Sequence, residues 1–365
     1  MKITFIINSL NSGGAERVGV SLANGLSKLG HEISIFTHKD NIKYIPDSSI
    51  KMHWLHRHKN KLIKFISFFN QFFHHFVNDR PDIVIQIMHI RSLELLSARF
   101  FAGRKFPIVI SEHNSFERPA SAPMGKWQSF TKWHLNKLYD CITVLTQADK
   151  KYIGNKLRNV HVMYNPLFLK PLENLCKKEK IILSAGRIDD WYYKGFDILI
   201  KSWERICRKY PEWKLKIIGD GSEKNINFLK TLANNIDNIE FSHFTTNIQQ
   251  EYQKASIYCL PSRYEGWGLV VPEAMSQGCA TIACDYKGRQ KEVIKDNING
   301  IICQPENEIQ LTDKIELLID NNDLRAKIAL NAMRSLDQLS EFRIAKEWEM
   351  LIQETISHFK GSLKN

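Results

Sequence analysis

The sequence predicts an α/β protein of two domains, each built on a parallel sheet with flanking helices. At 365 residues the chain is long enough for two separate hydrophobic cores. It opens with an apolar strand at Lys2–Ile7, a glycine turn, a helix that ends at Gly30, and a second strand at Glu32–Thr37. This strand–helix–strand order is typical of parallel sheets, and Ile181–Ala185 restarts it later in the chain.

Further apolar runs continue the alternation in both halves. Their length and their flanking turn residues are those of buried strands. The runs are Pro81–Gln86, Pro107–Ser111, Cys141–Leu145, Trp213–Ile218, Ile239–Phe241, Ile257–Leu260 and Ala280–Ala283. Pro166, Pro171 and the polar stretch up to Lys180 form a linker between the halves. We therefore expect one domain over residues 1–167 and a second over residues 168–341.

The composition excludes several protein classes. The chain is 43% hydrophobic and 25% charged, as in an ordinary globular protein, and no apolar run approaches the ~20 residues of a membrane span. Its N-terminus turns polar too soon for a signal peptide. Seven cysteines without a Cys-x-x-Cys pair argue against a disulfide framework or a zinc site. We expect a protein of the reducing cytoplasm.

The net charge of +12 is unevenly distributed. Up to Leu167 there are 23 Lys and Arg against 11 Asp and Glu, whereas the rest of the chain has 28 of each. A basic half suits nucleic acid, an anionic membrane surface or a substrate with a pyrophosphate, and it is also compatible with a solvated face that binds nothing.

Lys51–Val77 is the most unusual segment of the basic half. Phenylalanine, leucine and isoleucine recur in it at helical spacing, and cations cluster before them: His53, His56, Arg57, His58, Lys59, Lys61 and Lys64. One interpretation is an amphipathic helix that lies in a membrane interface. The other is a core helix that packs on the sheet behind a solvated basic approach. The basic, aromatic stretch Ala120–Tyr139 likewise suits either a lipid-linked acceptor or an ordinary helix and loop.

The stretch Ser262–Gly278 carries the strongest functional signal. It reads SRYEGWGLVVPEAMSQG, between two predicted strands. Pro272 suits the first turn of a helix, which places Glu265 in the preceding loop and Glu273 at the helix start. Gly266 and Gly268 let a phosphate approach the backbone, while carboxylates beside a phosphate need hydroxyls to bind. The alternative is that Glu273 only favours the helix dipole and Glu265 is solvated.

This stretch resembles the Glu-x7-Glu signature of the retaining glycosyltransferases of family 4, with Trp267 where the family usually has Phe. Three other places match the family in order: Gly-Gly-Ala-Glu-Arg from Gly13, His113 after a strand, and Arg187 followed by Lys194-Gly-Phe-Asp. Taken singly, these are also compatible with a tight turn, a structural histidine and surface cations. The Gly-Gly/x-Pro-Glu turn of the family lacks its proline here, in Asp285–Glu292.

The resemblance implies the GT-B fold, with two Rossmann-like domains that face each other across a cleft and a closing helix over residues 342–365 that returns to the first domain. It implies that Glu273 holds the ribose and Glu265 the donor sugar. Arg187 and Lys194 would neutralise the leaving diphosphate without a metal ion, and no cofactor besides the nucleotide-sugar substrate is implied. The expected catalytic residues are Glu265, Arg187, Lys194 and His113. The expected donor-binding residues are Gly13, Gly14, Arg187, Lys194, Phe244, Glu265, Gly268, Leu269, Val270 and Glu273.

The resemblance further implies transfer of a hexose or N-acetylhexosamine, from a UDP-sugar, to a polyprenyl-pyrophosphate-linked glycan of a bacterial capsule, O-antigen or exopolysaccharide. Partners would then be the donor, the lipid-linked acceptor and an anionic membrane surface, but not nucleic acid. Two alternatives remain at this point: a GT-B nucleotide-sugar epimerase, which would isomerise its donor without an acceptor, and a basic nucleic-acid-binding protein, whose binding would depend strongly on salt.

Overall fold

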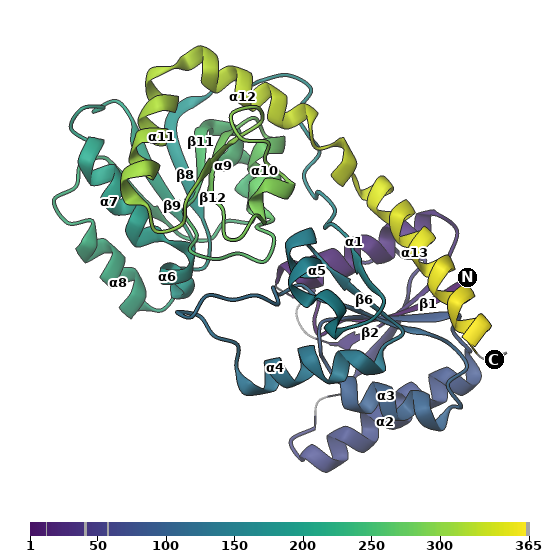
Figure 1. Ribbon diagram of the computed structural model, residues 1–365. Coiled ribbons are helices and arrows are strands. Elements are labelled where there is room, and N and C mark those ends of the chain that lie inside the picture. Colours follow the sequence, from purple (N-terminus) through teal and green to yellow (C-terminus); the bar gives the residue numbers. More distant parts are fainter. Residues whose placement is uncertain (12, 40–41, 57, 363–365) are drawn as a thin grey trace. The chain divides into compact units, whose positions relative to one another are not determined.

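The chain forms two compact units, each with its own parallel sheet (Figure 1). A computed structural model describes residues 1–11, 13–39, 42–56 and 58–362. The first unit is Met1–Pro166 with Leu339–Asn365, and the second is Leu167–Gln338. The expected boundary after residue 167 lies one residue from the observed one, and the expected boundary after residue 341 lies three residues from it. The predicted fold class of two parallel-sheet α/β domains is confirmed.

The first unit has a seven-stranded sheet in the order β3-β2-β1-β4-β5-β6-β7, with every strand parallel to its neighbours. The strands are β1 (Lys2–Ile6), β2 (Glu32–His38), β3 (Lys51–Leu55), β4 (Ile83–Ile87), β5 (Ile108–Ser111), β6 (Cys141–Val144) and β7 (Val160–Val162). The helices are α1 (Gly14–Lys28), α2 (Lys61–Asn78), α3 (Ser92–Phe101), α4 (Lys126–Trp133), α5 (Gln147–Ile153) and α13 (Glu341–Ser362).

Alternate residues of the central strands supply two cores, one on each face of this sheet. Ile3 and Phe5 of β1 join a cluster with buried residues of α1 and α13, whereas Ile6 joins a cluster with α2 and α3. Successive strand side chains point to opposite faces, so one apolar strand serves both cores. Figure 1 shows α13 alongside α1, and α2 alongside α3, as their contacts require.

The segment Lys51–Val77 differs from the single helical segment that the sequence suggested. Lys51–Leu55 is the edge strand β3, and its His53 lies half-buried with its ring stacked on Phe36 at 4.4 Å. The helix begins only at Lys61, where the Asn60 side chain caps it by accepting hydrogen bonds from the next backbone N–H groups. Arg57 lies outside the described residues.

The second unit has a six-stranded parallel sheet in the order β10-β9-β8-β11-β12-β13. The strands are β8 (Glu179–Ala185), β9 (Lys214–Ile218), β10 (Ile239–Ser242), β11 (Ala255–Leu260), β12 (Ala280–Cys284) and β13 (Ile301–Cys303). The helices are α6 (Trp191–Lys194), α7 (Phe196–Ile206), α8 (Glu223–Leu232), α9 (Ile248–Lys254), α10 (Val270–Ser276), α11 (Glu308–Asp320) and α12 (Asn322–Arg334). One core cluster joins the strands to α7, α8 and α11.

Candidate active site

In the second unit, four neighbouring parallel strands end at the same edge, and the segments that follow three of them carry the predicted donor residues. Arg187 and Lys194 follow β8, Phe244 follows β10, and Glu265 and Glu273 follow β11. Such an edge is where open α/β sheets bind ligands.

At one point the loop after β11 has a backbone conformation that favours glycine. Gly268 has a φ of 76°, and a Cβ there would lie 3.2 Å from the Gln290 amide nitrogen and 3.3 Å from Leu260. The Gln290 amide donates to the Trp267 carbonyl at 3.1 Å and so holds the same peptide. Leu269 and Val270 then start α10, with Glu273 in its first turn and only 6% exposed.

Glu265 and Lys194 form the central pair of this site. Lys194 Nζ lies 2.6 Å from Glu265 Oε1, although the two residues are 71 positions apart in the chain. The Ser262 hydroxyl donates to the same carboxylate oxygen at 3.0 Å. Both side chains of the pair keep some exposure to solvent. The pair therefore places a cation and a hydrogen-bond acceptor side by side within reach of a ligand.

Arg187 lies at the start of the same loop and is largely exposed. Its only described ion pair is a loose one, with 3.4 Å between Nε and an Asp190 carboxylate oxygen. The stem of Lys194 passes over Gly186, since a Cβ on that glycine would meet Lys194 Cδ at 3.4 Å. Lys194 and Arg187 thus belong to one loop surface, with Arg187 the freer of the two cations.

Arg263 is a residue of this site that the sequence interpretation missed. Its guanidinium makes two hydrogen bonds of 2.8 Å to the Asp197 carboxylate and one of 2.6 Å to the Tyr192 carbonyl. It thereby ties the loop of Glu265 to the loop of Lys194. The sequence shows Asp197 in the Lys-Gly-Phe-Asp run and an arginine two residues before Glu265. No local sequence pattern indicates that these two residues, 66 positions apart, contact each other.

Gly195 brings these two loops together. It has a φ of 68°, and the Pro261 carbonyl oxygen occupies the space that a Cβ would need. The glycine of the Lys-Gly-Phe-Asp run is therefore required for a close approach of two backbones.

Phe244 lies at the same edge, after β10. Its backbone N–H donates to the Asp220 carboxylate at 3.2 Å, and its side chain is 60% exposed. Asp220 belongs to the loop after β9, so the loops after the two strands are joined.

In the first unit, Gly13, Gly14 and His113 also lie at the carboxyl edge of the sheet, after β1 and β5, with β4 between these strands. Gly13 has a φ of 108° and precedes Gly14, the first residue of α1. A Cβ on Gly13 would collide with the Glu16 carboxylate. Burial raises the pKa of that carboxylate, against a hydrogen bond from its own backbone that lowers it.

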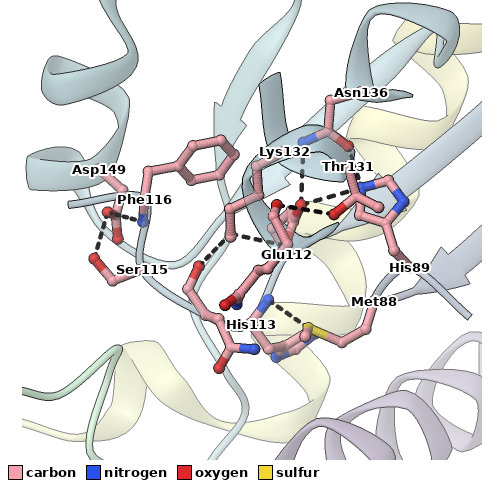
Figure 2. Close-up of polar contacts among 12 residues, drawn as sticks. Met88, His89, Glu112, His113, Ser115, Phe116, Thr131, Lys132, Asn136 and Asp149 are labelled. Atoms are coloured by element: carbon pink, nitrogen blue, oxygen red, sulfur yellow. Dashed lines mark hydrogen bonds and ion pairs between the residues drawn. The ribbon is translucent and has the colours of Figure 1, made fainter. Parts of the chain in front are cut away.

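His113 comes directly after Glu112, which belongs to a buried network of polar side chains shown in Figure 2. Glu112 lies 2.9 Å from Lys132 Nζ and accepts a hydrogen bond of 3.0 Å from Asn136. The backbone N–H of His113 points to the Met88 sulfur at 3.2 Å, and its Nε2 lies 3.1 Å from the Ser111 hydroxyl. Burial lowers the pKa of His113 to about 4, with Glu112 only partly opposing it. This lowered pKa indicates a neutral imidazole near pH 7.

The chain matches two family models that together cover most of its length. Glycosyltransferase Family 4 matches residues 12–169, and Glycosyl transferases group 1 matches residues 169–335. An uncharacterised glycosyltransferase of Haemophilus influenzae is 30% identical over 95% of this chain and 98% of its own length. This chain belongs to the family 4 glycosyltransferases. The family predicted from the Glu265/Glu273 stretch is thereby confirmed.

Another relative and two solved structures match this glycosyltransferase over nearly its whole length, and the solved structures share its fold. A Campylobacter jejuni protein named as an α-1,4-N-acetyl-D-galactosaminyltransferase acting on a diNAcBac-PP-undecaprenol-linked glycan is 29% identical over 97% of this chain and 99% of its own. A Rickettsia africae glycosyltransferase structure has a TM-score of 0.80 at 19% identity, covering 97% of this chain and 98% of its own. Anabaena HepE, in complex with UDP and glucose, has a TM-score of 0.77 at 17% identity, covering 97% and 100%. The predicted GT-B fold is confirmed.

Within residues 1–11, 13–39, 42–56 and 58–362, no helix of this glycosyltransferase has the length and hydrophobicity needed to cross a membrane. Nor do His, Cys, Asp and Glu side chains in these ranges gather in a group of three or more that could hold a metal ion.

Proposed function

We propose that this glycosyltransferase transfers a hexose or N-acetylhexosamine, with retention of configuration, from a UDP-sugar to a hydroxyl of a lipid-linked glycan during bacterial surface-polysaccharide assembly. The observation that carries the proposal is the 2.6 Å contact between Lys194 and Glu265 at the carboxyl edge of the second sheet. A diphosphate needs a cation and a sugar needs hydrogen-bond acceptors, and this pair supplies both at one point.

Donor binding would redistribute the contacts of this pair. The ammonium of Lys194 has three donors, so it can contact a diphosphate oxygen while it still holds Glu265. Glu265 keeps lone pairs for hydroxyls of the donor sugar, and the deeply buried Glu273 would accept from the ribose. Arg187, exposed and only loosely paired, would fold onto the diphosphate from the other end of the loop.

These cations act on the bond that breaks. As the bond between the anomeric carbon and the diphosphate oxygen lengthens, negative charge grows on the diphosphate. Lys194, Arg187 and the backbone N–H groups at Gly268–Val270 would stabilise that charge, which lowers the barrier. The acceptor hydroxyl would attack from the face of the leaving group, and its proton would pass to the leaving phosphate oxygen. Neutral His113 would contact the donor sugar.

The relatives support the choice of substrates. The Campylobacter relative is named for an undecaprenyl-diphosphate-linked acceptor. A second relative, 26% identical over 96% of this chain and 99% of its own, is named as an Erwinia amylovora amylovoran biosynthesis glycosyltransferase. The Anabaena neighbour binds UDP. We include in the proposal an approach to an anionic membrane surface on the cytoplasmic side, through the first turns of α2, where Leu62, Ile63 and Ile66 are exposed beside Lys59 and Lys61.

The proposal is tested by calorimetric binding of UDP, GDP, ADP and TDP to the wild type and to Glu273→Ala. We expect selective binding of UDP that weakens by about tenfold or more in the variant, because a buried acceptor for the ribose is lost. Glu223→Ala is the matched control, since Glu223 also lies in the first turn of a helix of the second unit but is exposed. Selective binding of GDP would reject the UDP assignment, and a folded protein that binds none of the four would reject the site.

A Glu265→Gln variant separates donor binding from transfer. It should bind UDP as the wild type does and lose transfer of the sugar, because Glu265 is assigned to the sugar and not to the nucleotide. Product analysis with the donor alone distinguishes the epimerase alternative, which would isomerise the UDP-sugar without an acceptor.

A further inference from the structure

The loop Glu112–Phe116 lies at the carboxyl edge of the first sheet and is held in place by side chains of α4 and α5. It follows β5 directly. Lys132 Nζ donates to the Asn114 carbonyl at 2.6 Å and lies 3.9 Å from the centre of the Phe116 ring. The Asp149 carboxylate accepts from the Ser115 hydroxyl and from the Phe116 N–H, both at 2.8 Å. Figure 2 shows Lys132 and Asp149 approaching the loop from two directions.

The ion pair between Lys132 and Glu112 is buried to a degree unusual for two charges. The two side chains are only 1% and 2% exposed. Burial by itself would raise the pKa of Glu112, but Lys132 and His89 outweigh it and lower the pKa to about 2. Burial lowers the pKa of Lys132, and the Glu112 carboxylate opposes that shift. A buried ion pair contributes little net stability compared with apolar side chains, because both charges lose their hydration. Its consequence here is geometric, since it determines where the Asn114 carbonyl lies.

Asn114 differs from its neighbours in the loop. Its backbone is fixed by Lys132, yet its side chain is partly exposed, and the amide has no hydrogen-bond partner among the residues that the structure describes. An asparagine amide offers two donors and one acceptor oxygen, which matches the hydroxyl or acetamido group of a sugar. Because the loop is held before any ligand binds, such a contact would cost little ordering entropy.

We propose that Asn114 is a further substrate-contacting residue, which hydrogen-bonds a sugar hydroxyl or acetamido group, and that Lys132 is the positioning residue that sets it. This inference rests on the proposed function. The sugar can belong to the donor or to the acceptor, and the kinetic experiment distinguishes the two.

The test is steady-state transfer by wild type and Asn114→Ala with UDP-N-acetylgalactosamine and an undecaprenyl-diphosphate-linked glycan ending in N-acetylgalactosamine. We expect kcat/KM to fall about tenfold or more while the Kd of UDP changes by less than about twofold, because UDP is assigned to the second unit. A rise in the donor KM alone assigns the contact to the donor sugar, and a rise in the acceptor KM alone assigns it to the acceptor. Asn155→Ala, an exposed asparagine of the same unit, is the matched control. An Asn114→Ala enzyme with wild-type kcat/KM for both substrates overturns the proposal.

The role of Lys132 is tested with the double variant Glu112→Gln/Lys132→Met, which removes both buried charges together. We expect it to fold with a urea midpoint near that of the wild type, to lose kcat/KM as Asn114→Ala does, and to lose little more when Asn114→Ala is added. A folded double variant with full activity overturns the positioning role. If the double variant does not fold, the Asn114→Ala result still decides the proposal. A wild type that binds UDP and transfers the sugar keeps the proposed function intact even where Asn114→Ala has no effect.

Discussion

Single residues of the site depend on partners far along the chain. Glu265 and Lys194 could be identified from motif spacing, but their 2.6 Å contact depends on Arg263, Asp197 and the close approach at Gly195. Arg263, Lys132 and Asn114 carried no comparable signal. An arginine or a lysine is ordinary in a loop or on a helix, and only the group that it contacts shows which loop it holds. His53 likewise appeared to be one of a row of exposed cations, whereas it is half-buried against Phe36.

His53 leads to a prediction at this scale. Burial, together with the nearby His75, lowers the pKa of His53 from 6.5 to about 4. As the pH falls below 6.5 the unfolded state takes up a proton first, so the stability that neutral His53 contributes is complete above pH 6.5 and is lost towards pH 4. We expect the free energy of unfolding in urea to decline over this range, and to decline less steeply in His53→Phe. The exposed His58→Asn is the control, and an unchanged slope in His53→Phe would contradict the assignment.

Among the elements, α2 has features of both helices that the sequence left open, a core helix and one with an exposed apolar face. Its later turns bury Phe68, Phe72 and Phe76 in the core over β2 and β4. Its first turns leave Leu62 at 67% and Ile63 at 53% exposure. One apolar stripe therefore begins at the surface and ends in the core. Helical periodicity shows where such a stripe runs but not how much of it the sheet covers.

The exposed start of α2 is the basis of a membrane-binding prediction. Lys59, Lys61 and Lys64→Glu together should weaken binding to vesicles that contain phosphatidylglycerol, since each lysine near an anionic surface contributes roughly 1 kcal/mol. Co-sedimentation with vesicles, compared with pure phosphatidylcholine, measures this. The charge-matched control is Lys224, Lys230 and Lys254→Glu, on exposed positions of the second unit. Equal losses in the two triple variants would show that net charge alone matters, and no loss in the first would reject α2 as the docking element.

At the scale of the whole molecule, the last helix completes the first unit. α13 begins at Glu341, after the chain has built the entire second unit, and its Ile344, Trp348 and Ile352 enter the core beside α1. Its contacts with α1 join parts of the chain more than 300 residues apart. The stability of the N-terminal unit therefore depends on the C-terminal segment.

Trp348→Ala tests this dependence. Trp348 is 3% exposed, and loss of a large buried ring costs about 3–5 kcal/mol of unfolding free energy. We expect the urea midpoint of the first unit to fall while binding of UDP, assigned to the second unit, persists. Met350→Ala is the control, because Met350 lies on the same helix and is 61% exposed. Equal effects of the two substitutions would show that α13 is not held through its buried face.

The sequence by itself determined the fold class, the glycosyltransferase family and the order of the candidate donor residues. Apolar strands, glycine turns and the Glu-x7-Glu spacing are local patterns, and each is legible without knowledge of its partners. Only the tertiary structure revealed the edge strand β3, whose residues are ordered by pairing with β2. It also revealed the strand β7 at the opposite edge of the sheet and the helix α3. It also decided the ties of Arg263 to Asp197 and of Lys132 to Glu112. These ties join residues 20 to 66 positions apart, and contacts of that kind arise from packing between elements, which no local pattern specifies.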